Sequence, residues 1–330
     1  MGRRAAAARQ RVGTASARSV PARTAACRGT AARLVKFHAP EIVFGIGSLV
    51  EAAHATLRFG GFRPFLVTDP GLIDAGWVSE LEDHLTEQGL TATVWSGLTP
   101  NPKDFEIAAG FEVYQEGECD VIIALGGGSV IDAAKGVAVL AANGGNILDY
   151  EGVDQATKPI PPLVMVPTTS GTGSEVARGA IVIVDDGRKL GFHSWHLVPK
   201  AALLDPELTL GLPPLLTAAT GMDAIAHCME TFMAEPFNPP ADGIALDGLA
   251  RGWAHIERAT RNGQDREARL QMMSASMQGA MAFQKGLGCV HSLSHSLGGV
   301  NPRLHHGTLN AVFLPAVVRF NAEAPSVQRD

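Results

Sequence analysis

Short apolar runs alternate with amphipathic stretches over the first two thirds of the chain. The runs PFLVTD (64–69), DVIIAL (120–125) and PPLVMVP (161–167) are rich in β-forming residues and end in turn residues, which predicts buried strands. Helical stretches lie between them. This alternation predicts a parallel α/β sheet in a domain that covers residues 35–212.

A different pattern interrupts the alternation near the end of this domain. The segment AIVIVDDGRKLGF (180–192) carries Asp-Gly at positions 186–187 between two apolar runs. Asp-Gly between strands is a strong turn signal, so the segment predicts a β-hairpin.

After Leu212-Pro213-Pro214 the β-forming runs disappear. Helical periodicity extends over 217–234, 241–261 and 265–286. The pattern predicts that residues 213–330 form an all-helical second domain.

Residues 1–34 lack any periodic apolar pattern and consist mainly of Arg, Ala, Ser and Thr. The segment is expected to be a disordered or spurious basic extension; a mitochondrial presequence has the same composition. The expected location is therefore the cytoplasm, or the mitochondrion if residues 1–34 are a presequence.

Composition narrows the functional classes. The net charge is −6, but eight Arg and Lys36 lie in residues 1–40, and the other 290 residues hold 18 bases against 33 acids. An acidic body argues against a nucleic-acid partner. The chain lacks an apolar run of about 18 residues, which argues against a membrane partner, and its four Cys are far apart, as expected for reduced thiols.

A glycine loop marks the expected nucleotide site. Gly126-Gly127-Gly128-Ser129 follows an apolar run and leads into the helical stretch VIDAAKGVAVLAA. Glycines at a strand-to-helix turn let backbone N–H groups approach a pyrophosphate, which predicts a bound nucleotide or dinucleotide. The alternative is a tight turn with Ser129 as a helix N-cap. In the usual dinucleotide fingerprint an acid follows the glycines, whereas here the suitable acid, Asp69, precedes them.

A second polar loop, residues 167–175 (PTTSGTGSE), follows another predicted strand. If that strand is parallel to the one before the glycine loop, both loops leave the same carboxyl edge, where α/β sheets bind ligands.

Metal-ligating residues gather in the helical half. Asp223 and His227 are four residues apart, as are His291 and His295, and His305-His306 follows. Residues at i and i+4 share one helix face. One carboxylate with three imidazoles suits Fe(II) or Zn(II) and leaves a position for substrate.

Together these motifs resemble the iron-containing (group III) alcohol dehydrogenase family, which is related to glycerol dehydrogenase and dehydroquinate synthase. The resemblance rests on GGGSVIDAAK (126–135), PTTSGTGSEV (167–176), residues 189–209, GMDAIAHCMET (221–231) and residues 291–311. It implies an α/β dinucleotide-binding domain followed by a helical metal-binding domain, with the active site between them. It also implies a homo-oligomer.

The resemblance assigns residues to roles. The metal ligands fall on Asp223, His227, His291 and His306, with His305 as a neighbouring candidate, and His295 falls where the family has a histidine near the nicotinamide. The NAD-binding residues fall on Asp69, Asn101, Gly127, Gly128, Ser129, Thr168, Thr169, Thr172 and Lys189.

The resemblance implies an NAD-dependent, metal-dependent oxidoreductase (class 1.1.1) that interconverts a small primary alcohol and its aldehyde. Iron is expected, with zinc possible. The alternatives are a glycerol dehydrogenase-like zinc enzyme and a non-catalytic remnant that binds nucleotide and metal. The remnant is considered because the family continues through several more helices, whereas this sequence stops at Asp330, so that the helical domain is expected to be shortened.

Overall fold

The computed structural model describes residues 36–184, 187–301 and 303–328. The basic extension predicted over residues 1–34 and Asp186 of the predicted hairpin turn lie outside these ranges.

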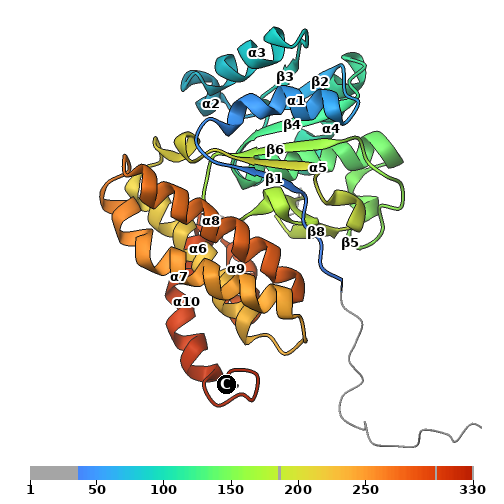
Figure 1. Cartoon of the computed structure of the whole chain (residues 1–330). Coiled ribbons are helices and arrows are strands. Elements are labelled where there is room, and N and C mark those ends of the chain that lie inside the picture. Colours follow the sequence, from blue (N-terminus) through green and yellow to red (C-terminus); the bar gives the residue numbers. More distant parts are fainter. Residues whose placement is uncertain (1–35, 185–186, 302, 329–330) are drawn as a thin grey trace, which may run out of the picture. The chain divides into compact units, whose positions relative to one another are not determined.

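A six-stranded parallel sheet is the centre of the first half (Figure 1). Its strand order is β1-β9-β6-β4-β2-β3, and every pair in it is parallel. The strands are β1 (Glu41–Phe44), β2 (Pro64–Val67), β3 (Thr93–Trp95), β4 (Val121–Gly126), β6 (Leu163–Pro167) and β9 (Ala201–Leu204). The prediction of a parallel α/β sheet is confirmed.

The helices of this half are divided between the two faces of the sheet. On β4, Ile123 and Leu125 join the core on the face covered by α1 (Glu51–Arg58) and α3 (Trp77–Glu87). Ile122 and Ala124 join the core on the opposite face, beneath the long helix α5 (Gly128–Asn143). Every residue of β4 is buried, which explains why its sequence is continuously apolar. The other helices of this half are α2 (Pro70–Asp74) and α4 (Asp104–Glu116).

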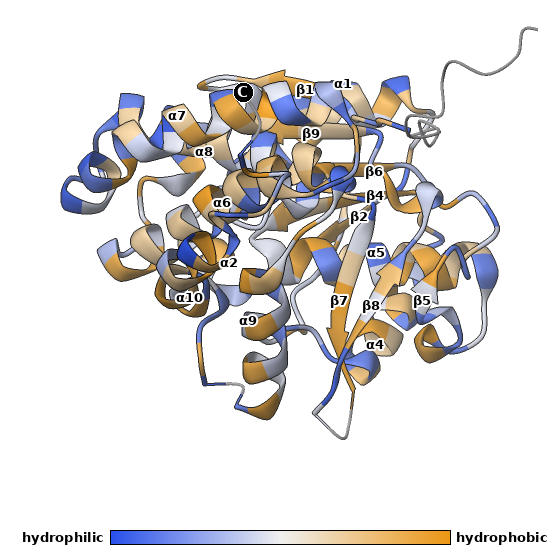
Figure 2. Cartoon of the chain, turned by 90° about the horizontal axis from the view of Figure 1, so that it is seen from below, coloured by the Kyte–Doolittle hydropathy of each residue, from blue (hydrophilic) through white to orange (hydrophobic). Residues whose placement is uncertain are grey.

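Three strands form a separate small sheet in the order β5-β8-β7. Strands β7 (Gly179–Ile183) and β8 (Lys189–His193) are antiparallel, as the hairpin prediction requires, and β5 (Gly152–Val153) pairs with β8. In Figure 2 β7 is mainly hydrophobic, whereas β8 alternates between hydrophobic and hydrophilic residues. The buried residues Val182, Leu190 and Phe192 of these strands join the core beneath α5.

From residue 214 on, the described residues form helices and connecting turns, with no strand. Helices α6, α7 and α8 pack against one another, and α10 packs against α6 and α9. The bounds are α6 (Pro214–Met233), α7 (Pro239–Arg261), α8 (Arg266–Ala282), α9 (Cys289–Val300) and α10 (His306–Asn321). The all-helical second part is confirmed. In the part of the chain that the structure covers, no helix combines the length and the apolar character needed to cross a membrane.

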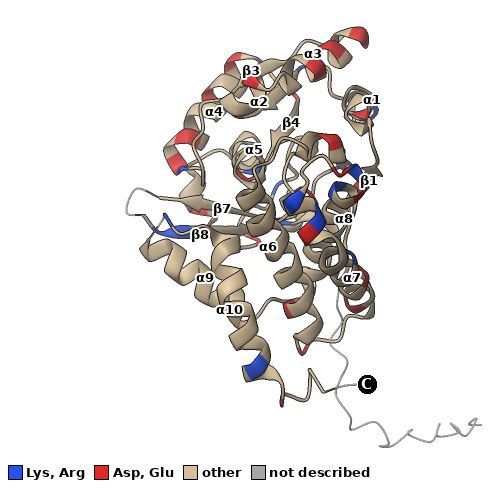
Figure 3. Ribbon diagram, turned by 90° about the vertical axis from the view of Figure 1, so that its left-hand side faces the viewer, with Lys and Arg blue, Asp and Glu red and all other residues tan. Residues whose placement is uncertain are grey.

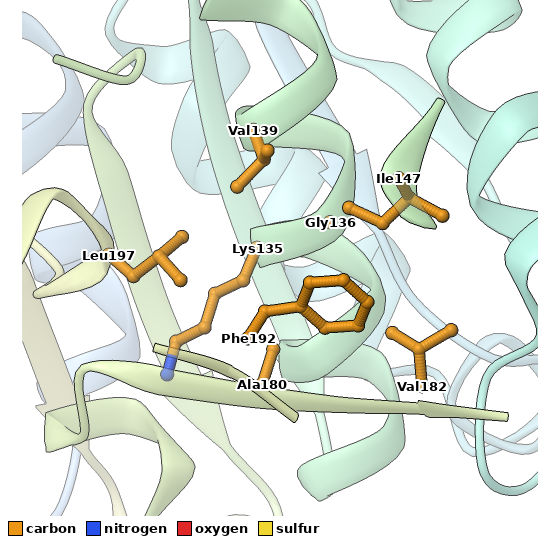
Figure 4. A pocket seen from close by; sticks show the side chains of 8 residues that line it. All are labelled: Lys135, Gly136, Val139, Ile147, Ala180, Val182, Phe192 and Leu197. Atoms are coloured by element: carbon orange, nitrogen blue, oxygen red, sulfur yellow. The ribbon is translucent and has the colours of Figure 1, made fainter. Parts of the chain in front are cut away.

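A buried ionic cluster ties α5 to the polar loop that follows β6. The Lys135 side chain is fully buried, and its Nζ donates hydrogen bonds to the carbonyl oxygens of Ser174, Ala177 and Gly179 at 2.7, 2.8 and 2.7 Å. Figure 4 shows the side chain leaving α5 among apolar residues, with its nitrogen beside the strand that carries Ala180. Lys135 therefore fixes the backbone between the polar loop and β7.

Two carboxyl groups complete the cluster. Asp132 accepts hydrogen bonds from the Ser174 hydroxyl (2.9 Å) and from the N–H of Ile181 (3.1 Å). Burial lowers the pKa of Lys135 to about 8, and it raises the pKa of Glu175 to about 7. Burial thus disfavours each charge, and the cluster relies on its mutual contacts.

Candidate functional site

The two predicted nucleotide loops leave the same edge of the sheet. β6 is parallel to β4, with Gly126 opposite Pro167, and the N–H of Thr168 donates to the Gly126 carbonyl oxygen at 3.1 Å. In the sheet, β3 lies on one side of β2, whereas β4, β6 and β9 follow one another on the other side. The direction in which strands are added therefore reverses between β2 and β4. Open α/β sheets bind ligands at such a point.

The glycine loop begins α5 without a side-chain cap. The N-cap is Gly127, and the first helical residue is Gly128. The alternative in which Ser129 is the N-cap is therefore wrong. The Ser129 Oγ instead accepts a hydrogen bond from the N–H of Asn101 at 3.0 Å, which attaches the loop before α4 to this turn.

Glycine is needed here because the second polar loop packs closely on the turn. A Cβ on Gly127 would lie 3.3 Å from Thr169, and one on Gly128 would lie 2.9 Å from Thr172. The structure thus brings these four predicted cofactor residues side by side, with free backbone N–H groups of the first helical turn available to a phosphate.

Asp69 lies at the end of β2, beside this loop pair in the sheet order. Its side chain is the N-cap of α2 and accepts the N–H of Leu72 at 3.2 Å. The residue therefore has a structural role in addition to the predicted cofactor role.

Lys189 connects the hairpin with the helical half. Its Nζ lies 3.4 Å from the Asn101 Oδ1, and a Cβ on Gly298 of α9 would lie 3.6 Å from the same nitrogen. Burial lowers the pKa of Lys189, and its charge helps to lower the pKa values of His295 and His306. Lys189 thus connects the predicted NAD-binding residues with the part of α9 that carries predicted active-site residues.

The metal-ligating residues form a compact buried group. Asp223 and His227 share one face of α6, and with His291 of α9 they present ligand atoms that all lie within 4.8 Å of one another. The Asp223 Oδ1 is 3.9 Å from the His227 Nε2 and 3.4 Å from the His291 Nε2. All three residues are at most 5% exposed, so water does not screen the carboxylate.

The fourth predicted ligand is His306 rather than its neighbour His305. The His306 Nε2 lies 3.5 Å from the Asp223 Oδ1, whereas His305 is exposed and is the N-cap residue of α10. Gly307 explains the placement, because a Cβ there would collide with the Ala219 carbonyl oxygen of α6. The His-Gly pair thus lets α10 begin directly against the helix that carries Asp223.

The protonation of this group suits a cation. Burial raises the pKa of Asp223, but His227, His291 and His306 outweigh burial and hold that pKa well below its usual value. Burial lowers the pKa values of His227 and His306 to about 4. The His227 and His306 imidazoles are therefore neutral near pH 7, which is the form that binds metal. Burial alone would lower the pKa of His291, but its hydrogen bonds to Asp223 and Glu230 raise that pKa to about 9, so a metal that binds there displaces a proton.

The second ring nitrogens of two predicted ligands are held by protein partners. The Nδ1 of His291 contacts the Glu230 carboxylate, and the Nδ1 of His306 lies 3.2 Å from the Ser294 hydroxyl. Both Nε2 atoms are thereby directed toward Asp223. Partners of this kind are typical of metal-bound histidines, so the group fits a divalent ion bound by one carboxylate and imidazole nitrogens.

Sequence reasoning missed Glu230, Ser294 and Asn310. The Asn310 Nδ2 donates to the Asp223 Oδ1 at 2.7 Å. Glu230 lies three residues after His227 on α6, and Asn310 lies four after His306 on α10. Helical spacing from a predicted ligand is the signal that could have found Glu230 and Asn310.

His295 stands next to the group without joining it. Its ring centroid lies 4.7 Å from that of His306 and 6.1 Å from that of His291, and it is partly exposed. Burial lowers its pKa to about 4, with His306 as the next cause. Helix α9 carries no Lys, Arg, Asp or Glu (Figure 3), so imidazole provides its only titratable groups apart from Cys289.

Comparison with known proteins agrees with this geometry. Residues 39–206 match the family model described as iron-containing alcohol dehydrogenase, and residues 217–329 match the C-terminal domain of the same family. The 4-hydroxybutyrate dehydrogenase of Cupriavidus necator is 61% identical over 295 residues, which cover 87% of this chain and 76% of that protein. The 1,3-propanediol dehydrogenase of Citrobacter freundii is 38% identical, with 88% of this chain and 76% of that protein covered.

Solved structures agree as well. A crystal structure of a 1,3-propanediol oxidoreductase has a TM-score of 0.86 at 34% identity and covers 90% of this chain and 81% of its own. An alcohol dehydrogenase from Oenococcus oeni has a TM-score of 0.85 at 33% identity, with 88% and 77% covered. The chain belongs to the iron-containing alcohol dehydrogenase family and is an NAD-dependent oxidoreductase of small alcohols and aldehydes.

Proposed function

We propose that the protein interconverts an ω-hydroxy carboxylic acid, with 4-hydroxybutyrate as the leading candidate, and the corresponding aldehyde acid. The observation that carries this proposal is the 61% identity to a 4-hydroxybutyrate dehydrogenase. The cluster of Asp223, His227, His291 and His306 supports it, because a metal bound there lies beside the loops expected to hold NAD.

We propose the following division of roles. Asp223, His227, His291 and His306 hold the metal, and Asp69, Asn101, Lys189 and the two polar loops orient NAD. When bound, the metal supplies Lewis-acid polarisation of the substrate oxygen, and the nicotinamide accepts the hydride. The loop residues are Gly127, Gly128, Ser129, Thr168, Thr169 and Thr172.

Other aspects of the function follow the same proposal. The partners are small molecules and, by family resemblance, further copies of the chain. The described cysteines Cys119, Cys228 and Cys289 are free, which supports a reducing compartment such as the cytoplasm.

A substrate panel tests the proposal. The metal-loaded protein is assayed with NAD through the absorbance change of the nicotinamide, using 4-hydroxybutyrate, 1,4-butanediol and 1-butanol. Recognition of the substrate carboxylate through one charge-assisted contact would raise kcat/KM for the hydroxy acid above that for the neutral alcohols by roughly 10- to 100-fold, and this is the result that we expect. Equal kcat/KM values for the three substrates would refute the hydroxy-acid assignment and would indicate an alcohol dehydrogenase without a preference for a carboxylate.

Asp69 is expected to determine the choice between NAD and NADP. Its carboxylate accepts hydrogen bonds from the ribose hydroxyls and repels a 2′-phosphate. Asp69→Asn keeps a side chain that caps α2 but removes the charge, so the kcat/KM ratio of NAD to NADP should fall by about ten- to hundredfold. Asp74→Asn, at the exposed end of the same helix, is the control and should leave the ratio unchanged. An unchanged ratio in Asp69→Asn would assign the residue to capping alone.

His295 is expected to act on protons and not on the metal, because it lies beside the ligand group without belonging to it. His295→Ala should retain its metal and lose roughly 10- to 10,000-fold in kcat at neutral pH, the range expected when water replaces a proton relay well or poorly. The measurement pairs elemental analysis with kcat. His255→Ala on α7 is the control. The His255 Nδ1 lies 2.9 Å from the Arg251 carbonyl oxygen of the same helix, and this variant should change neither the metal content nor kcat. Metal loss in His295→Ala would instead make the residue a ligand.

A further inference from the structure

Glu230 occupies a position that the nucleotide and metal assignments leave unexplained. It lies on α6 one turn beyond His227, and it is 2% exposed. Burying a carboxylate is costly unless its oxygens are satisfied. Here both carboxylate oxygens accept hydrogen bonds from the first turn of α9.

One role of the carboxylate is to cap α9. The N-cap residue of that helix is Gly288, which has no side chain to accept the first free N–H groups. The Glu230 Oε1 accepts the N–H of Val290 at 2.6 Å, and its Oε2 accepts the N–H of His291 at 3.2 Å. A Cβ on Gly288 would lie 2.9 Å from the same Oε1, so glycine gives the carboxylate room to approach.

The other role concerns the His291 ring. Its Nδ1 contacts the Glu230 Oε2, and an ionised carboxylate only accepts hydrogen bonds. In the neutral form of the ring, which is the form that binds a metal, the proton is therefore placed on Nδ1. The lone pair is then left on Nε2, which faces Asp223 at 3.4 Å. A carboxylate behind a metal-bound imidazole fixes the tautomer and raises the basicity of the ligand.

We propose that Glu230 is a positioning residue of the metal centre, which aligns α9 through its first N–H groups and directs the His291 Nε2 toward the ion. This inference rests on the proposed metal site, and it adds a role for a residue outside the ligand set. Because the same carboxylate performs both tasks, the orientation of the ring is coupled to the placement of the helix that carries it.

An amide cannot replace the carboxylate in this setting. In Glu230→Gln, one of the two former oxygen positions carries an NH₂ group. At the Oε1 position it faces the N–H of Val290, and at the Oε2 position it faces the N–H and the Nδ1 of His291. Either orientation sets one donor against another, and the second one also favours a proton on the Nε2 that should bind the metal.

The test measures metal affinity instead of turnover. Zn²⁺ binding to the full-length wild-type protein and to Glu230→Gln is measured by competition with a chromophoric chelator. We expect the variant to bind Zn²⁺ about 10- to 100-fold more weakly, as is typical when the partner of a metal-bound histidine is lost. Affinity within about threefold of the wild type would overturn the proposal.

A second cap in the same half of the chain provides the control. The Asp265 side chain is the N-cap of α8 and accepts the N–H of Ala268 at 3.0 Å. Asp265→Ala is expected to lower the melting temperature while the Zn²⁺ affinity stays within about threefold of the wild type. A loss of affinity as large as that of Glu230→Gln would show that general destabilisation is responsible, and would overturn the proposal.

A conservative variant covers the case in which Glu230→Gln does not fold. Glu230→Asp keeps the charge but withdraws it by one methylene from His291, so its Zn²⁺ affinity should lie below that of the wild type; affinity equal to the wild type would overturn the proposal. If the wild type itself binds no Zn²⁺, the proposed metal site fails together with this inference. If the wild type and both variants bind equally, only the role of Glu230 fails.

Discussion

His227→Ala is expected to lose the metal and to lower kcat/KM by about a thousandfold or more. The imidazole is one of the buried ligands that we propose for the metal, and a remnant with fewer ligands binds a divalent ion more weakly. Lewis-acid stabilisation of several kcal/mol is lost with the ion, and each 1.36 kcal/mol corresponds to a factor of about ten in rate. Elemental analysis after anaerobic purification, combined with the assay, measures both effects.

His305→Ala is the matched control for this experiment. His305 precedes His306 directly but is exposed, so its removal should leave metal content and activity close to those of the wild type. Stoichiometric metal in His227→Ala, or metal loss in His305→Ala, would contradict the ligand set. The same analysis distinguishes iron from zinc, which imidazole and carboxylate ligands do not separate sharply.

Lys135→Met is expected to lower the free energy of unfolding by about 3–5 kcal/mol, the usual cost of removing one partner from a buried ionic group. Met fills nearly the same space but cannot donate to the three carbonyl oxygens that Lys135 holds. It also removes the cation that favours the ionised forms of Asp132 and Glu175. Urea-induced unfolding of the wild type and the variant measures the difference.

An exposed lysine provides the comparison. Lys200→Met replaces a side chain at the surface, just before β9, and should change the free energy of unfolding by less than about 0.5 kcal/mol. A loss below about 1 kcal/mol in Lys135→Met would mean that water or other donors satisfy the freed carbonyl groups. A loss of the expected size would show that the contacts of Lys135 between α5 and the polar loop stabilise the fold.

The sequence by itself determined the classes of element and their order. Buried parallel strands need continuous apolar runs, because helices cover both faces of the sheet, and such runs mark β2, β4 and β6 directly. The i, i+4 spacing of Asp223 and His227 reflects the helix repeat alone. The family motifs then linked these local signals to NAD and a metal.

The tertiary structure decided whatever depends on contacts between distant segments. The family motif assigned the fourth ligand to His306 and left His305 as a neighbouring candidate, and the close approach of Gly307 to α6 is what places the His306 Nε2 beside Asp223. Glu230 lies 61 residues from the histidine that it contacts, and Lys135 lies 39 to 44 residues from the carbonyl groups that it holds. A buried carboxylate or ammonium group takes its role from the partners that satisfy its charge, and folding alone brings those partners together.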